Sequence, residues 1–92
     1  IFKEAQIIWL TPLLQRDDVF DAMLKSENRG LCIIGDNDRC YIKERFEQLN
    51  DKSTIVTKLL PNVNHSLEYN HNIIESIDVL KEVMNDIQEF IV

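Results

Sequence analysis

The chain has 92 residues, a formal net charge of −6 and 45% hydrophobic residues, which is typical of one soluble globular domain or of part of one. The acidic excess and the scattered positions of the ten Lys and Arg residues argue against nucleic acid or an anionic membrane surface as a partner. No stretch approaches the roughly 20 apolar residues of a membrane span.

The first half of the chain predicts strand, helix and strand. The apolar run Ala5–Thr11 is typical of a strand buried on both faces of a parallel sheet, and Pro12 ends it because proline lacks an amide donor. The acidic pair at 17–18 is a candidate start for a short helix with apolar residues at three- and four-residue spacing. Leu31–Gly35 predicts the second strand.

The second half predicts helix, strand and helix. We expect a helix from about Tyr41 to Leu49, a strand over Thr54–Leu60, and a long last helix capped by Asn72 or Ser76. The apolar stripe of that last helix steps by four and three residues and is expected to cover the sheet. It comprises Ile73, Ile77, Leu80, Met84, Ile87 and Ile91, widened by Ile74, Val83 and Phe90.

The alternation of strands and helices predicts an α/β fold of βαβαβα order, with three parallel strands covered by helices in a partial three-layer α/β/α arrangement over residues 1–92. Right-handed connections would place successive strands side by side. We expect the first strand, Ala5–Thr11, to pair on its far side with further sequence, because an apolar edge would otherwise be free to associate.

An acid and a histidine are predicted to meet at one edge of this sheet. Asp36 and Asp38 follow the second strand, and His65 follows the third. Ligands of open parallel sheets lie beyond the carboxyl ends of the strands. A carboxylate that accepts from Nδ1–H leaves Nε2 free to take a proton from a nucleophile. A helix cap and a surface histidine are the alternative interpretations.

The second half of the chain resembles the C-terminal portion of an α/β-hydrolase, and the likeness extends over essentially all 92 residues. The run Gly35-Asp36-Asn37-Asp38 is similar to the Gly-x-x-Asp turn of that family, and the segment from Asn62 to Glu68 is similar to its histidine turn, followed by a closing helix. The resemblance implies a small serine esterase or lipase without a lid at this point, with Asp38 as the triad acid and His65 as the base. Asp36 is the rival acid.

The family's Gly-x-Ser-x-Gly elbow is absent, since Gly30 and Gly35 are the only glycines. Ser66 adjoins His65 and Cys40 lies close to Asp38, and neither is favoured as the nucleophile. We therefore expect the nucleophile and the oxyanion hole to lie outside this chain, which does not begin with Met, and we expect the chain alone to be inactive.

No metal site or organic cofactor is expected. His71 and His65 are six residues apart, which does not place them on one helical face, and a surface position is favoured for His71. Cys32 is expected in the core, and the two cysteines form no disulfide framework. A reducing cytoplasm fits these cysteines, and Ile1–Glu4 lack the features of a signal peptide.

The leading hypothesis is a serine hydrolase that acts on a small ester or acyl substrate, completed by the rest of its parent domain. One alternative is a non-catalytic α/β-hydrolase-like module for binding or assembly. Another is a free-standing α/β domain that self-associates through the Ala5–Thr11 edge.

Overall fold

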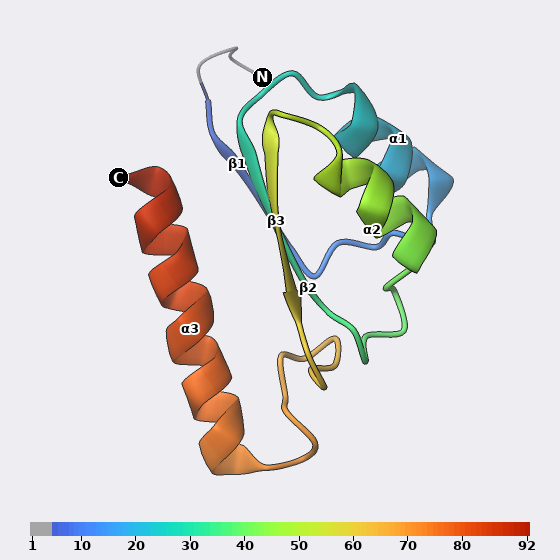
Figure 1. Cartoon of the computed structure of the whole chain (residues 1–92). Coiled ribbons are helices and arrows are strands. Elements are labelled where there is room, and N and C mark those ends of the chain that lie inside the picture. Colours follow the sequence, from blue (N-terminus) through green and yellow to red (C-terminus); the bar gives the residue numbers. More distant parts are fainter. Residues whose placement is uncertain (1–4) are drawn as a thin grey trace.

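The computed structural model describes residues 5–92 and shows one parallel sheet with helices on both faces (Figure 1). The expectations about Ile1–Glu4 concern residues outside this range. The strands β1 (Ile7–Leu10), β2 (Gly30–Gly35) and β3 (Ile55–Leu60) are hydrogen-bonded in the order β1-β2-β3. The helices are α1 (Asp17–Lys25), α2 (Lys43–Asn50) and α3 (Ile73–Ile91). The predicted α/β fold with βαβαβα order is confirmed.

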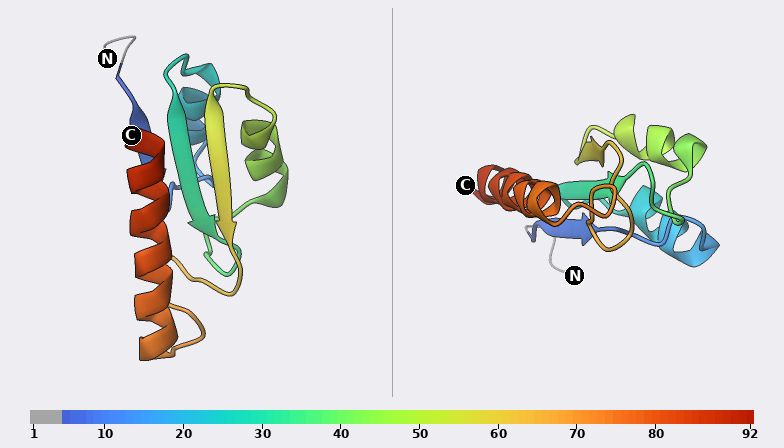
Figure 2. Two further views of the ribbon diagram at one scale, coloured as in Figure 1. Left: turned by 60° about the vertical axis from the view of Figure 1, so that its left-hand side comes forward. Right: turned by 90° about the horizontal axis from the view of Figure 1, so that it is seen from below.

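The layers follow from the direction in which the chain crosses the sheet. Each of α1 and α2 connects a strand to its neighbour, and both lie on the same face of the sheet, whereas α3 lies on the other face (Figure 2). Right-handed connections that proceed in one direction place their helices on one face. All six residues of β2 are buried, because this strand has a strand on each side and helices above and below.

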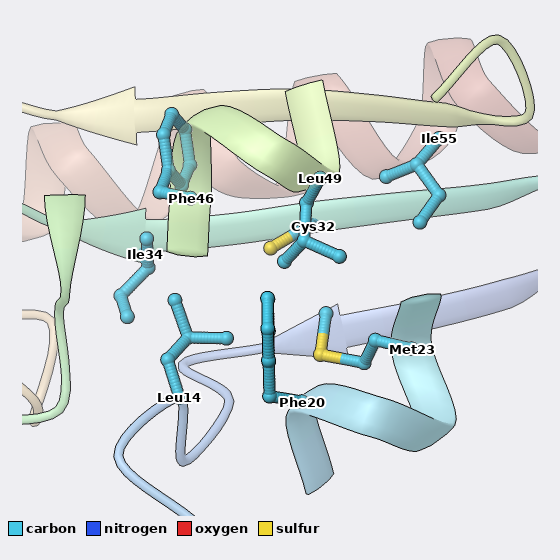
Figure 3. Close-up of a cluster of buried hydrophobic side chains, with 8 residues drawn as sticks. All are labelled: Leu14, Phe20, Met23, Cys32, Ile34, Phe46, Leu49 and Ile55. Carbon is cyan, nitrogen blue, oxygen red and sulfur yellow. The ribbon is translucent and has the colours of Figure 1, made fainter. Parts of the chain in front are cut away.

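The larger core cluster lies between the sheet and the pair α1 and α2 (Figure 3). It is formed by Leu14, Phe20, Met23, Cys32, Ile34, Phe46, Leu49 and Ile55. The Trp9 ring packs against this cluster and lies directly on Gly30, where a Cβ atom would come within 3.0 Å of Trp9 Cη2. Gly30 is the first residue of β2. Because it has no side chain, the Trp9 ring can lie directly against its backbone.

The rotation of α3 differs from the prediction. Its buried residues are Val79, Val83 and Phe90, which pack on the sheet, while most of the predicted stripe is exposed. Polar contacts hold this orientation. Lys58 of β3 contacts Glu82 at 3.2 Å, and Arg29 donates to the carbonyl oxygen of Phe90 at 2.7 Å. On α3 the buried residues Val83 and Phe90 lie beside the predicted stripe on one broad apolar face, so periodicity alone did not decide which part of it faces the sheet.

The prediction that the first strand is buried on both faces is wrong. β1 is shorter than Ala5–Thr11, and Ile8 and Leu10 are exposed. These two residues pair with Leu31 and Ile33, whose side chains lie on the α3 side of the sheet. Since α3 packs mainly on β2, it leaves this face of β1 uncovered.

The predicted capping residues at the starts of the helices are confirmed only in part. Asn72 caps α3, because its side chain accepts from the backbone N–H of Glu75. Ser76 instead accepts from Tyr69 N and donates to the Asn72 carbonyl oxygen, which ties the preceding loop to the helix. The acidic pair at 17–18 starts α1 without a cap hydrogen bond.

Candidate active site

Asp38 lies in the turn after β2 and its carboxylate is completely buried. The turn is closed by backbone bonds from Asp38 N to Gly35 O and from Tyr41 N to Asp38 O. Oδ1 accepts from the backbone N–H of Cys40 at 2.7 Å, and Oδ2 lies 2.9 Å from His65 Nδ1. Both carboxylate oxygens therefore have partners, as burial of a charged group requires.

His65 is held by a closed turn that Asn64 organises. The Asn64 side-chain oxygen accepts from the backbone N–H groups of Ser66 and Glu68, and Asn64 N donates to Glu68 O. Leu67 has a φ of 60°, a conformation that non-glycine residues rarely adopt. This local hydrogen bonding fixes the direction in which His65 leaves the backbone.

A close approach of two backbones brings the histidine turn to the acid turn. Val63 is buried, and its carbonyl oxygen accepts from Asn37 N at 3.1 Å. A Cβ atom on Gly35 would overlap that carbonyl oxygen and lie 2.6 Å from the carbonyl carbon of Val63. The φ of Gly35 is not positive, so glycine is needed here for space and not for backbone conformation.

Asp36, the rival acid, has a different partner. It is exposed, and its Oδ1 accepts from the backbone N–H of Asn62 at 2.7 Å. Asn62 has a φ of 62°, so Asp36 stabilises the sharp turn that leaves β3. The geometry thus pairs His65 with Asp38 and gives Asp36 a place in the support of the loop.

The Asp38–His65 pair has the arrangement of an acid and a general base. An ionised carboxylate only accepts hydrogen bonds, so Nδ1 carries the proton and Nε2 is the basic nitrogen. The His65 side chain is 32% exposed and borders a shallow hollow of about 170 Å³. Asn37, Arg39, Asn64 and Ser66 form the rest of its lining. The ring therefore joins a buried carboxylate to a solvent-accessible surface.

Cys40 lies closer to the pair than its sequence position indicated. One ligand-type atom from each of Asp38, Cys40 and His65 lies within 4.8 Å of the others. These are donor types that zinc accepts, but both oxygens of Asp38 already take part in hydrogen bonds and the Cys40 side chain is buried. The hydrogen bonds of Asp38 therefore favour a structural carboxylate over a metal ligand. His71 is exposed and does not belong to this group of three residues.

The aromatic residues Tyr41, which follows the acid turn, and Trp9, whose ring lies on Gly30 at the other end of β2, belong to the core. Tyr41 packs edge to face on Phe46 with ring centroids 5.7 Å apart, and Trp9 packs on the same cluster. Cys32 is also buried there, and burial raises the pKa of its thiol to about 12. Cys32 is therefore protonated and unreactive at neutral pH.

Comparisons with protein-family models, curated proteins and solved structures gave no match for this chain. Among residues 5–92, none of the helices is both long and apolar enough to cross a bilayer.

Proposed function

We propose that this chain supplies the acid and the general base of a serine hydrolase of the α/β-hydrolase type, acting on carboxylic esters or related acyl compounds. The observation that carries the proposal is the 2.9 Å contact between Asp38 Oδ2 and His65 Nδ1. The carboxylate is fully buried and the ring is partly exposed, so one side of the imidazole is fixed and the other is accessible.

In the proposed reaction, Nε2 of His65 acts as the general base and then as the general acid. Nε2 takes the proton of a serine hydroxyl as that oxygen attacks the acyl carbon of the ester. It returns this proton to the departing alcohol as the bond between the acyl carbon and the alcohol oxygen breaks. Asp38 keeps Nδ1 protonated and stabilises the imidazolium in between. A water molecule then attacks the acyl carbon of the acyl-enzyme while Nε2 takes its proton. The proton passes to the serine oxygen as the bond between that oxygen and the acyl carbon breaks, which releases the carboxylic acid.

In this proposal the serine and the oxyanion hole come from a polypeptide segment outside the 92 residues, the remainder of a hydrolase domain. No metal or organic cofactor takes part in the scheme, and its substrate is a small ester or acyl compound. A reducing cytoplasm suits the two free cysteines, Cys32 and Cys40.

The test is hydrolysis of 4-nitrophenyl acetate by the longest natural polypeptide that contains this sequence. Removal of a general base typically costs about 10²–10⁴ in rate, so His65→Ala is expected to lower kcat/KM by that amount. Asp38→Asn is expected to lower it by a similar factor, because it removes the acceptor that sets the tautomer. Asp36→Asn is the matched control and should retain nearly full activity.

Folding of each variant is checked by circular dichroism and thermal unfolding. If His65→Ala hydrolyses the ester as fast as the wild type, the proposal is wrong and a non-catalytic binding or assembly module becomes the better interpretation. If Asp36→Asn loses activity and Asp38→Asn does not, the acid has been assigned to the wrong residue.

A further inference from the structure

The exposed side of α3 carries a continuous apolar stripe. Its exposed members are Ile73, Ile74, Ile77, Leu80, Met84 and Ile91, whose exposed fractions range from 46% to 78%. Ile87 belongs to the same row and is partly buried. A single exposed apolar side chain needs no explanation, whereas the largest contiguous apolar patch of a protein is often functional.

The stripe has the spacing of a helix that pairs with another helix. Its residues other than Ile74 recur in steps of four and three over almost the whole of α3, which is the a and d pattern of a coiled-coil seam. The side that packs on the sheet uses the other apolar row, Val79, Val83 and Phe90. One apolar row of α3 therefore packs on the sheet. The other row, the exposed stripe, is available to a second partner.

The stripe is also symmetrical along the helix. Counting outward from Glu82, Leu80 corresponds to Met84, Ile77 to Ile87, and Ile73 to Ile91. An antiparallel pair of identical helices centred at Glu82 therefore places an a residue opposite a d residue in every layer, as antiparallel packing requires. A two-fold axis needs a self-complementary surface of this kind.

The carboxylates of α3 lie off the a and d rows, and the one basic residue of this helix, Lys81, lies beside them. The acidic residues of the helix are Glu75, Asp78, Glu82, Asp86 and Glu89, and none belongs to the a and d rows. Two of them, Glu82 and Asp86, contact Lys58 on the β3 side. Pairing of two copies along the stripe would therefore bury no carboxylate, which would otherwise be costly.

The exposed area is close to what a stable dimer needs. At about 100 Å² for a fully exposed aliphatic side chain, the stripe together with the exposed Val92 offers about 450 Å² of apolar surface. A standard interface buries about 800 Å² per subunit, of which roughly 60% is apolar. The stripe and Val92 together supply nearly all of that apolar part.

We propose that the exposed stripe of α3 is a dimer interface on which the α3 helix of a second copy of this chain packs antiparallel. The inference goes beyond the proposed function, and it requires that the remainder of the proposed hydrolase domain leaves this side of α3 open. Its occupant is the same chain, and its contacts are made by helix side chains rather than by the free edge of β1. The residues that line the hollow beside His65 take no part in it.

The test is sedimentation equilibrium of the longest natural polypeptide that contains this sequence, at protein concentrations from about 1 to about 200 μM, which cover the micromolar affinity of a modest interface. The expected mass approaches twice the monomer mass at the upper end. Met84→Glu should weaken the dimer on the order of 100-fold, because two carboxylates would enter the apolar seam. Asn85→Glu makes the same change of charge one residue away, off the stripe, and should leave the dimer nearly intact.

Salt gives an independent readout. Each copy carries a net charge of −6, so the copies repel and added salt should strengthen the dimer. The monomer mass at every concentration would overturn the inference and assign the stripe to the remainder of the hydrolase domain. Equal effects of Met84→Glu and Asn85→Glu would also overturn it. A dimer that survives Met84→Glu but is lost in Ile8→Lys would assign the interface to β1 and also overturn it.

Discussion

The contact between Gly35 and Val63 yields the sharpest prediction, because it joins the fold to the candidate site. In Gly35→Ala the new Cβ would overlap the carbonyl oxygen of Val63 and lie 2.6 Å and 2.9 Å from its carbonyl carbon and its Cβ atom. Ordinary contacts between such atoms are about 3.5–4.0 Å. The backbone at Val63 must therefore move by on the order of 1 Å, and His65 lies two residues further along.

The energetic cost follows from this displacement. Overpacking in a well-packed site costs about 1–3 kcal/mol, and loss of the bond from Asn37 N to Val63 O adds about 1 kcal/mol. The lower entropy of the unfolded chain with alanine returns about 0.4–1 kcal/mol. We therefore expect Gly35→Ala to reduce the free energy of unfolding by about 1–3 kcal/mol.

The assay is urea unfolding together with the NMR chemical shifts of the His65 ring. Gly30→Ala is the matched control, because the added methyl meets the Trp9 ring at the other end of the same strand. It should destabilise the fold but leave the His65 signals in place, whereas Gly35→Ala should both destabilise the fold and move the His65 signals. If Gly35→Ala unfolds within about 0.5 kcal/mol of the wild type and its His65 signals do not move, the argument that Gly35 positions the histidine turn is refuted.

Two further predictions concern the core. Phe90→Ala should cost about 3–5 kcal/mol in urea unfolding because it empties a buried site under the Arg29 side chain, whereas Met84→Ala should cost less than about 0.5 kcal/mol. The reverse order would mean that α3 has been placed with the wrong face on the sheet. The second prediction uses the thiol of Cys32, whose pKa is raised to about 12 by burial. Above about pH 9 the unfolded chain loses this proton while the folded protein keeps it, so the free energy of unfolding should fall with rising pH, by up to about 1.4 kcal/mol per pH unit. Cys32→Ala should flatten that slope between about pH 9 and pH 10, below the range in which Lys58 deprotonates, and equal slopes would contradict the burial of a neutral thiol there.

Much of the fold and of the site was predictable because the signals are local. Short apolar runs bounded by turn residues indicated the strands, and the alternation with helices indicated a parallel sheet. Parallel strands end at the same edge, so Asp38 and His65 were expected to meet, and their 2.9 Å contact agrees. The catalytic role of the pair remains a proposal.

The remaining features depend on packing between distant segments. The periodicity of α3 indicated an amphipathic helix but not which of its two apolar rows meets the sheet. That choice is seen only in the packed structure, where Val79, Val83 and Phe90 are buried against the sheet. The need for glycine at position 35 arises from Val63, 28 residues away in sequence. The proximity of Cys40 to His65 likewise appears only once the two turns are packed together.

The hydrogen bond from His65 to Asp38 is the basis of the proposed function, and NMR of the ¹⁵N-labelled imidazole tests it directly. At about pH 9, where an ordinary histidine is neutral, we predict that His65 carries its proton on Nδ1. Asp38→Asn should shift the proton toward Nε2, and Asp36→Asn should leave it on Nδ1. A wild-type protein with the proton on Nε2, or an Asp38→Asn variant with an unchanged tautomer, would contradict the proposed pairing of acid and base.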